Sequence, residues 1–437
     1  MKRLLILGAG TAGTMVANKL RPKLGESDWN ITVVDQDETH YYQPGFLFMP
    51  FGEYKREDLE KPKQELIHDG IEVVMAEIES VATEANTVKL ANGTELAYDY
   101  LVIATGTSPR PEETPGLASD EWYKSVFDFY TIDGAEALAA KLADWEGGKL
   151  VMNIVEMPIK CPVAPMEFLF LAEAFFDEKG MGDKVELEYV TPLPAAFTKP
   201  IAAKHLGEML EERHISVEPD FMLESVDTEA RKLVSYDERE VEYDLLVTVP
   251  LNMGADFVGR SGLGDELNHV PVDKHTFVSK EHPNIFALGD AAALPTSKAG
   301  SVAHFSVDVF VENFMEYIEG RPMHEKYDGH ANCFVEAGRG KGMLIDFNYD
   351  TEPLPGMYPV PVVGPFSLLK ETRTNHFGKL MAKWMYWNLL LPGRPLPLRS
   401  EMSLAGKHVE LLGANGDAEA TDADEFPIPQ FTNEGGN

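Results

Sequence analysis

Uninterrupted apolar runs alternate with stretches of helical periodicity along this chain. An apolar run without polar alternation is typical of a strand buried on both faces of a parallel sheet. Such runs occupy residues 3–8, 31–34, 98–106, 148–155 and 284–290. Helical stretches continue to about Leu20 after the first run and from Met166 to Phe175 after the fourth. This order predicts an α/β fold with two Rossmann-like domains.

The first turn from strand to helix has the glycine spacing of a dinucleotide-binding fingerprint. Gly8, Gly10 and Gly13 follow the first strand directly, and the second strand ends in Asp35, 22 residues after Gly13. Glycines let the backbone approach a pyrophosphate at the helix N-terminus, and the acid accepts ribose hydrogen bonds. The alternative is a tight turn without a ligand. The expected contacts are Gly8, Ala9, Gly10, Thr11, Ala12, Gly13 and Asp35.

Length and charge narrow the class of protein. The chain has 437 residues, 44% of them hydrophobic and 25% charged, which is enough for two to three domains with sizeable cores. It carries 38 basic against 72 acidic residues, a net charge of −34, and such a surface repels phosphate backbones and disfavours nucleic acid as a partner. Because the acid excess runs through the whole chain, we interpret it as a halophilic surface solvated for high salt.

The number of cysteines and the hydropathy of the chain indicate where in the cell the protein can lie. Two cysteines are too few for a disulfide framework in a chain of this length. The apolar stretch in MKRLLILGAG is too short for a secretory signal, and no run of 18 apolar residues is present. We therefore expect a protein that is soluble or bound to a membrane surface.

Two later strand ends extend the dinucleotide-binding pattern. One ends in Thr105-Gly106 and the other in Gly289-Asp290, and ligands bind at the carboxyl ends of strands in open α/β sheets. With these segments the chain resembles the two-dinucleotide-domain flavoprotein disulfide reductase superfamily. The resemblance implies FAD as cofactor, with Gly289 and Asp290 at its ribityl and pyrophosphate part. Ala76, Thr105 and Gly106 are counted as further FAD contacts.

The second glycine-rich turn of that superfamily, which serves NAD(P)H, has no counterpart here. The strand at residues 148–155 is followed by EMPIKCPVAP, which contains three prolines and no glycine. Proline has no N–H for a phosphate, and bulky side chains hold the backbone away from it. We interpret the segment as a lost nicotinamide site. The alternative is a degenerate turn that still binds weakly.

Cys161 lies in this proline-rich segment and is the first candidate for redox chemistry. It precedes the helical stretch at Met166, and both a helix N-terminus and the adjacent Lys160 are expected to lower its thiol pKa. The other cysteine, Cys333, follows 172 residues later. A lone cysteine is more often a small hydrophobic core residue. Here one of only two cysteines replaces a cofactor loop, which favours a working pair.

Cys161 and Glu167, then Cys333 and Phe334, on a chain without the second glycine-rich turn, resemble the sulfide:quinone oxidoreductases. The resemblance covers nearly the whole chain, through YYQPGF, ATG, GDAA and DFNYD. It implies that both cysteines face the flavin and carry sulfur between them, and that Glu167 manages protons. It also implies that Phe334 and Lys379 belong to the quinone site.

Lys298 and Gly300 match a Lys-x-Gly stretch that reaches the pyrimidine side of the flavin ring in that family. A lysine there would stabilise negative charge on the reduced flavin. The alternative for Lys298 is a solvated surface position. Many family members carry a third cysteine, which is absent between Thr107 and Lys160. No spare cysteine exists to attach FAD, so we expect FAD to be non-covalent.

The resemblance implies a mechanism as well. Hydrosulfide attacks an oxidised Cys161–Cys333 linkage and leaves a persulfide on one cysteine and a thiolate on the other. The thiolate, assigned to Cys333, passes two electrons to the flavin, and a membrane quinone accepts them.

Residues 366–399 differ from the rest of the chain in composition. They contain six basic residues and one acid, a net charge of +5, together with Phe377, Trp384, Tyr386, Trp387 and the run 389–391. A short basic, aromatic helical segment is typical of a membrane interface. The alternative is a helix that packs on the protein's own acidic surface or on a sister subunit. We expect a peripheral protein on the cytoplasmic side of the cell membrane, and a homo-oligomer.

These expectations divide the chain into four parts. The FAD-binding domain takes residues 1–110 and 245–325, and a second Rossmann-like domain takes 111–244. A C-terminal quinone and membrane-interface region covers 326–412, and an acidic disordered tail covers 413–437.

The expected function is FAD-dependent oxidation of sulfide to sulfur or polysulfide, with quinone as electron acceptor. Three alternatives remain. They are an enzyme like a type II NADH:quinone oxidoreductase, the flavin subunit of a sulfide dehydrogenase, and a non-catalytic FAD-binding interaction protein.

Overall fold

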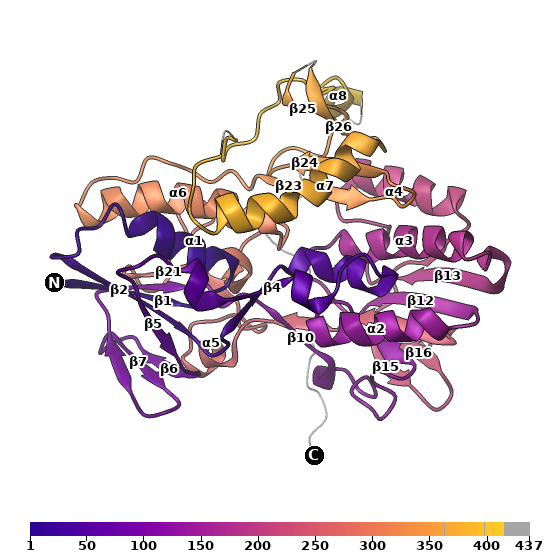
Figure 1. The fold of residues 1–437 in the computed structure, drawn as a ribbon, viewed down its shortest axis with the longest axis horizontal. Coiled ribbons are helices and arrows are strands. Elements are labelled where there is room, and N and C mark those ends of the chain that lie inside the picture. The colour runs from indigo at the N-terminus through magenta and orange to yellow at the C-terminus, as the bar shows by residue number, and fades with distance from the viewer. Residues whose placement is uncertain (362, 397, 415–437) are drawn as a thin grey trace.

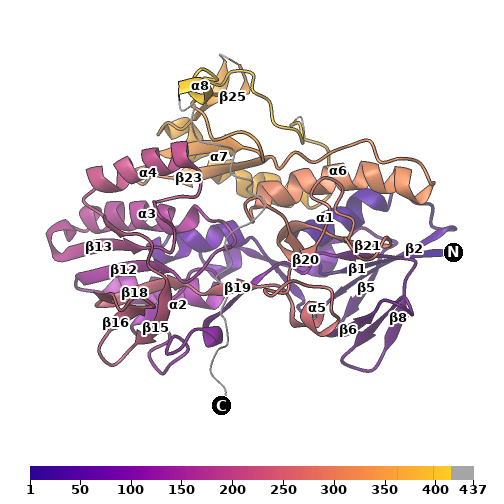
Figure 2. The same ribbon diagram turned by 180° about the vertical axis from the view of Figure 1, so that it is seen from behind.

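A computed structural model describes residues 1–361, 363–396 and 398–414. Two five-stranded parallel sheets lie side by side, and the C-terminal residues form a smaller sheet and a helix across one side of both (Figure 1). The reverse view shows the same arrangement, with the C-terminal layer again on one side (Figure 2). The predicted α/β fold with two dinucleotide-binding domains is confirmed.

The first sheet has the strand order β21-β9-β1-β2-β5, and its strands are β1 Lys2–Leu7, β2 Trp29–Asp35, β5 Glu72–Met75, β9 Tyr100–Ile103 and β21 Ile285–Ala287. All of its pairings are parallel. One face packs under helices α1 Thr11–Leu20 and α6 Gly300–Ile318. The other face packs on helix α5 and a small antiparallel sheet, with bounds α5 Asp256–Arg260, β6 Ile78–Ala82, β7 Thr87–Leu90 and β8 Glu95–Ala97. Because both faces are covered, the strands are apolar throughout.

The second sheet has the order β11-β18-β12-β13-β14, and its strands are β11 Val126–Phe127, β12 Gly148–Ile154, β13 Val185–Val190, β14 Ser216–Glu218 and β18 Leu245–Val249. Its helices and its small antiparallel sheet are α2 Ile132–Asp144, α3 Ala164–Glu178, α4 Pro200–Glu212, β15 Leu223–Asp227, β16 Lys232–Ser235 and β17 Glu240–Glu242. The predicted boundary at residues 244/245 needs a correction, because β18 pairs with β11 and β12 inside this second sheet. We place that boundary after Val249.

Short elements connect the two domains. The antiparallel pair of β10 Ser108–Arg110 and β19 Leu251–Met253 carries the chain out and back. A 3-10 helix at Gln43–Phe51 lies between β3 Thr39–Tyr41 and β4 Glu60–Pro62 and packs on α2 and α3 of the second domain. The strands β20 Val270–Pro271 and β22 Ala292–Ala293 form a small parallel pair in the first domain.

The C-terminal layer consists of the sheet β23-β24-β26-β25 and helix α7, with bounds β23 Ala331–Glu336, β24 Gly342–Phe347, β25 Gly356–Val360, β26 Gly364–Leu368 and α7 Arg373–Met385. Helix α7 packs on β23 and β24 (Figure 1). A π-helical turn at Tyr386–Leu390 and the short helix α8 Leu411–Ala414 follow. In the described residues no helix has the length and hydropathy needed to cross a bilayer.

The aromatic residues predicted to face a membrane fall into two groups. Phe377 and Trp384, on α7, are 61% and 53% exposed. Tyr386 and Trp387 are buried, which corrects the prediction for them. Their rings pack on Tyr42, and the Tyr386 hydroxyl lies 2.8 Å from Thr11 Oγ1 and 2.5 Å from His40 Nε2.

The alternative prediction, packing on the protein's own surface, is thus right for the end of this segment. Of the predicted tail at 413–437, residues 413 and 414 belong to α8, and residues 415–437 lie outside the described residues.

Candidate active site

The three glycines of the first turn have different surroundings at the carboxyl end of β1. A Cβ atom on Gly8, whose φ is +99°, would lie 2.5 Å from the Ala104 carbonyl oxygen, and one on Gly13 would meet the Gly8 carbonyl. Both positions therefore need glycine for packing. A Cβ atom on Gly10 would meet no atom within 4 Å. Gly10 faces open space, where a ligand's phosphates would lie.

The start of α1 leaves hydrogen-bond donors for an anion. Within the described part of the chain, no backbone carbonyl accepts from the N–H groups of Thr11, Ala12 or Gly13, and the first paired N–H of this turn is that of Thr14, on the Gly10 carbonyl. Unpaired N–H groups at a helix N-terminus, together with the helix dipole, favour a pyrophosphate.

Asp35 lies at the carboxyl end of β2, as the fingerprint requires. Its Oδ2 accepts from the Ala9 N–H at 2.6 Å, and its Oδ1 forms an ion pair with Lys63 Nζ at 2.7 Å. The Ala76 N–H, just after β5, donates to the Asp35 carbonyl oxygen at 2.8 Å. A carboxylate has about four acceptor positions, and the Asp37 N–H also donates to Oδ1 at 3.0 Å, so Asp35 retains capacity for one ribose hydroxyl. Lys63 carries no sequence signal that would have found it.

The neighbouring strand ends complete the expected FAD site, which we call the cradle. It consists of the Gly8–Gly13 turn, Asp35 and the residues that follow β9 and β21. Thr105 Oγ1, after β9, is a buried hydroxyl without a hydrogen-bond partner among the described residues. Cβ atoms on Gly106 and on Gly300, at the start of α6, would meet no atom within 4 Å. Gly289 has a φ of +62° and lies against Ala12, with Asp290 next to it. An orphaned hydroxyl, open glycines and unpaired N–H groups together fit a bound dinucleotide such as FAD.

Lys298 is buried, so the solvated surface position is wrong for it. Its Nζ donates to the carbonyl oxygens of Asp290 and Ala292 at 2.7 and 3.2 Å. Burial lowers its pKa to about 8, against the opposing effect of the Asp290 charge. Its own carbonyl accepts from the Cys161 N–H at 2.6 Å. Lys298 therefore joins the Gly289-Asp290 turn to the cysteine loop.

The corresponding turn of the second domain offers no such anion site. Helix α3 begins at Ala164, whose N–H already donates to the Cys161 carbonyl at 2.9 Å, and the Met166 N–H donates to the Val163 carbonyl at 3.2 Å. Residue 165 is proline and has no N–H. The donors that would bind a nicotinamide dinucleotide's phosphates are paired or missing, in contrast to α1.

The two cysteines come from different parts of the fold, Cys161 from the second domain and Cys333 from the C-terminal layer. Cys161 lies in the loop before α3 with a φ of +49°, and its carbonyl accepts from the Tyr130 hydroxyl at 3.1 Å. A positive φ at a non-glycine residue is uncommon and often marks a functional position. Cys333 lies on β23, and its side chain is hydrogen-bonded to Ser301. Both residues are half-buried, and both are thiols without a disulfide.

The two thiols are electrostatically coupled, but not in the direction predicted. Burial and the charge of Glu167 raise the pKa of the Cys161 thiol well above its ordinary value, with Cys333 adding to the effect. The same two causes raise the pKa of Cys333 to about 12, and Lys379 opposes them. The predicted lowering at Cys161 is therefore wrong for this structure. Lys160 turns away and donates to Gln43 Oε1 at 3.0 Å.

Glu167, Lys379 and Phe334 meet beside the cysteines although they are far apart in sequence. Glu167 is buried in the first turn of α3, and its Oε1 forms an ion pair with Lys379 Nζ. Lys379 also donates to the Phe334 carbonyl at 2.9 Å and lies over the Phe48 ring at 5.7 Å. Glu167 Oε2 is buried without a hydrogen-bond partner among the described residues. This oxygen is available to a substrate or a proton.

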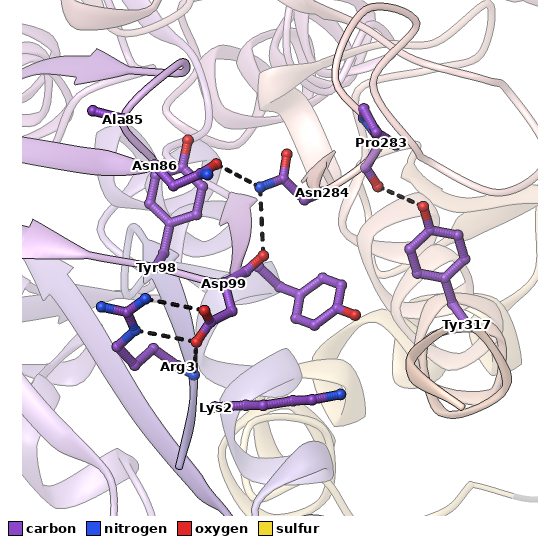
Figure 3. A pocket seen from close by; sticks show the side chains of 10 residues that line it. Lys2, Arg3, Ala85, Asn86, Tyr98, Asp99, Pro283, Asn284 and Tyr317 are labelled. Atoms are coloured by element: carbon purple, nitrogen blue, oxygen red, sulfur yellow. Dashed lines mark hydrogen bonds and ion pairs between the residues drawn. The ribbon is translucent and has the colours of Figure 1, made fainter. Parts of the chain in front are cut away.

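A hollow of about 600 Å³ lies at the opposite edge of the first sheet. It is lined where β1 and β9 begin, and its Arg3 is held by both carboxylate oxygens of Asp99, while Asn284 binds Asn86 (Figure 3). The hollow contains no cysteine or histidine. Cys161 and Cys333 lie away from this hollow, in the loop before α3 and on β23.

Several residues of this cluster escaped the sequence analysis. Tyr130 and Ser301 touch the cysteine segments, and Glu336 and His376 form a pair next to Lys379. Ser301 follows the Lys-x-Gly stretch directly, so its position was a usable signal. The others reach the site only through tertiary contacts, for which the sequence carries no local pattern.

Comparisons with known proteins show which proteins this chain is similar to. The family model described as pyridine nucleotide-disulphide oxidoreductase matches residues 2–154. The chain is 26% identical over 396 residues to the mitochondrial sulfide:quinone oxidoreductase of Mus musculus, covering 89% of this chain and 86% of that protein. It is 27% identical over 401 residues to the mitochondrial sulfide:quinone oxidoreductase of Dictyostelium discoideum, covering 90% and 86%.

Among solved structures, the sulfide:quinone oxidoreductase of Aquifex aeolicus superposes with a TM-score of 0.75 at 20% identity. The match covers 89% of this chain and 92% of that one. At this identity the superposition bears on the fold alone.

The fold has two dinucleotide-binding domains, residues 2–154 match the pyridine nucleotide-disulphide oxidoreductase model, and the open turn at Gly10 fits FAD as cofactor. Within that class the chain is a relative of the sulfide:quinone oxidoreductases, and the resemblance inferred from its motifs is confirmed over about nine tenths of its length.

Proposed function

We propose that this protein oxidises sulfide to sulfur or polysulfide and passes the electrons through FAD to a membrane quinone. The observation that carries the proposal is the meeting of Cys161 and Cys333 with Glu167 and Lys379, beside a second nucleotide turn whose donors are already paired. The relatives named sulfide:quinone oxidoreductases, similar over most of the chain, support it.

The cysteines perform the sulfur chemistry. In the oxidised state of the site, in which Cys161 and Cys333 are linked, hydrosulfide attacks that linkage, so that one S–S bond forms, another breaks, and a persulfide and a thiolate result. Closing the persulfide onto the thiolate forms a sulfur-bridged linkage and releases one proton and two electrons. Because burial beside Glu167 raises the pKa of both thiols, a thiolate released in this site is unfavourable, which favours its closure into a sulfur-bridged form.

We propose that the residues of the cradle bind FAD, and that Lys298 and Gly300 lie next to its flavin ring. FAD supplies the two-electron carrier between sulfur and quinone. Lys298 orients the Gly289-Asp290 turn through its two carbonyl contacts, and it also ties that turn to the Cys161 backbone. We propose non-covalent attachment, because both cysteines are used in the sulfur chemistry.

At the quinone end we propose that Phe334 and Lys379 bind the acceptor. Lys379 is held by Glu167 and by the Phe334 carbonyl, so its position is fixed before the quinone enters. Burial lowers the pKa of Lys379, but the Glu167, Cys161 and Glu336 charges outweigh burial and raise it. A charged lysine there stabilises negative charge that develops on a quinone oxygen.

We also propose peripheral membrane association through the outer face of α7, on the cytoplasmic side, and assembly as a homo-oligomer. Phe377 and Trp384 are exposed on that face, and Val360 and Val363 are exposed in the adjoining β25–β26 hairpin. Exposed aromatic and apolar residues of this kind, with nearby lysines, are typical of an interfacial surface.

An anaerobic visible spectrum of the purified protein tests the function. Sulfide alone should bleach the oxidised flavin band, and a quinone analogue should restore it. NADH should leave the band unchanged, because the α3 turn lacks free donors. Bleaching by NADH would instead favour a type II NADH:quinone oxidoreductase.

Two substitutions complete the test. Cys161→Ser and Cys333→Ser should each abolish bleaching by sulfide while FAD stays bound. If either variant keeps its sulfide activity, the cysteine scheme is wrong. If neither sulfide nor NADH bleaches the wild-type flavin, the non-catalytic alternative is favoured.

A further inference from the structure

Glu336 is a buried carboxyl that the proposed reaction does not use. It ends β23, three residues after Cys333, and its side chain is 1% exposed. Both carboxyl oxygens lie next to His376 Nδ1, at 2.9 and 3.0 Å. A buried carboxyl with one titratable partner requires an explanation, because an unpaired charge there would be costly.

The inner side of Glu336 adjoins the quinone end of the site. Its backbone N–H donates to Glu167 Oε1 at 2.6 Å, which is the oxygen that also binds Lys379. Lys379 and Glu336 act on each other's ionisation, since each charge favours the charged form of the other. Glu336 thus lies next to the Glu167–Lys379 ion pair.

The outer side leads to solvent. His376 lies in the first turn of α7 with its side chain 24% exposed. Burial raises the pKa of Glu53 in the neighbouring loop, and the His376 charge opposes this effect. Burial raises the pKa of Tyr54, in the same loop, and the Glu336 charge adds to this effect. Glu167 from α3, Lys379 and His376 from α7, and this loop are the titratable surroundings of Glu336.

The proposed reaction needs a proton at this position. Oxidation of hydrosulfide to zero-valent sulfur releases two electrons and one proton, whereas reduction of a quinone to a quinol consumes two electrons and two protons. At least one proton per turnover must therefore reach the quinone from solvent. A chain of titratable groups with small gaps is the usual means of moving it.

We propose that His376 and Glu336 form a proton-delivery pair that carries protons from solvent to Lys379 and Glu167 at the quinone end. His376 takes a proton at the surface, the Glu336 carboxylate receives it from Nδ1, and Glu336 passes it to the inner pair. This proposal rests on the proposed function. Both residues are positioning residues, because neither touches the sulfur or the quinone.

The alternative is that His376 and Glu336 form a purely structural ion pair that holds α7 against β23. Glu336→Gln separates the two, because the amide still accepts a hydrogen bond from His376 but cannot carry a proton. Burial raises the pKa of Glu336 to about 7, with Glu167 adding to it and Lys379 and His376 opposing. Delivery by the wild-type protein should therefore weaken as the pH rises through about 7.

The experiment measures the two half-reactions of the FAD-loaded protein separately. Reduction is followed after mixing with sulfide, and reoxidation after mixing dithionite-reduced protein with a short-chain ubiquinone analogue. We expect Glu336→Gln to leave reduction unchanged and to slow reoxidation about 10- to 100-fold, with loss of the pH dependence near 7. His376→Ala should slow reoxidation similarly, and added imidazole should restore it.

The matched control is His408→Ala, which removes an exposed His–Glu pair, His408 Nδ1 to Glu410 Oε1 at 3.0 Å, and should change neither half-reaction. A wild-type reoxidation rate and pH profile in Glu336→Gln would overturn the proposal. So would equal slowing of both half-reactions without imidazole rescue, which indicates a structural pair. Dithionite replaces sulfide in the second measurement, so reoxidation is measured whether or not sulfide reduces the flavin. If sulfide fails to reduce the wild-type protein, the proposed function is wrong, but proton delivery can still be tested.

Discussion

Lys379 on α7 donates a hydrogen bond to the main-chain oxygen of Phe334 on β23, at 2.9 Å. The same ammonium forms an ion pair with Glu167 on α3. One side chain of the C-terminal layer therefore joins the strand that carries Cys333 to the helix that follows Cys161.

Removing only the lysine should be costly for folding. Lys379→Met leaves the Glu167 carboxylate buried without its cation, so we expect a loss of about 3–5 kcal/mol in the free energy of unfolding. The double variant Lys379→Met/Glu167→Gln should recover much of that loss, because no buried charge remains. Urea unfolding of the FAD-free proteins measures both. Equal losses in the single and double variants would contradict a buried ion pair.

Gly10 should control FAD binding without affecting the fold. Its Cβ position is open, and it lacks the positive φ of Gly8, so Gly10→Leu should fold normally and fill the phosphate position. We expect FAD content to fall at least about tenfold, which a loss of 1.4 kcal/mol in binding would produce. Gly207→Leu is the matched control, since Gly207 in α4 is equally open. Full FAD retention by Gly10→Leu would show that the pyrophosphate lies elsewhere.

The outer face of α7 should bind lipid through Phe377 and Trp384. Changing both residues to Ser should release the protein from anionic liposomes in a co-sedimentation assay, because both side chains are more than half exposed. Tyr236→Ser is the control, as this residue is 58% exposed in the second domain. Unchanged co-sedimentation of the α7 variant would exclude this face.

Trp387→Ser should behave differently from those variants. Trp387 is 7% exposed, and it packs edge-on against His40 with Lys61 over its ring. Its loss should lower the free energy of unfolding by about 3–5 kcal/mol and leave lipid binding of the folded protein intact. Thermal unfolding together with co-sedimentation distinguishes the two effects. Loss of lipid binding without loss of stability would contradict the burial of this ring.

The buried Lys298 should make stability depend on pH in the alkaline range. Burial lowers its folded-state pKa to about 8, whereas the unfolded chain holds the proton up to about 10.4. Between these values the unfolded state binds more protons, so the free energy of unfolding should rise with pH. In the FAD-free protein Lys298→Met should remove this part of the slope. Parallel curves for the two proteins between pH 8 and 10 would place the lysine in solvent.

The halophilic interpretation also remains a prediction. With a net charge of −34, screening of self-repulsion should raise the unfolding temperature as KCl increases from 0.1 to 3 M. An unfolding temperature that stays constant or falls would count against it. Sucrose at equal osmolality is the control for general solvent effects.

The parts of the fold that were predictable are those with local signals. The Gly8–Gly13 turn, the acid at Asp35 and the Gly289-Asp290 strand end each occupy a few consecutive residues, and the helices and strands lie where their patterns indicated. Hydrophobic periodicity and the residue preferences of turns depend on residues that are close in sequence, so they can be recognised from the sequence alone.

The parts that were not predictable depend on tertiary packing. Composition could not show that Trp384 faces solvent while Trp387, three residues later, packs under Lys61. Likewise, the expected influence of Lys160 on Cys161 failed because the lysine turns to Gln43, and burial beside Glu167 dominates the thiol pKa. The Glu336–His376 pair joins a strand and a helix that no local pattern links.

The hydrogen bonds of the Tyr386 hydroxyl to Thr11 and His40 have a consequence for biogenesis. The first glycine-rich turn is synthesised more than 370 residues before the tyrosine whose hydroxyl binds Thr11. Gly289 and Gly300, which also belong to the cradle, are likewise synthesised long after the first turn. These contacts are therefore complete only after most of the chain has been synthesised, so we expect FAD to bind after the C-terminal layer has formed on the first domain.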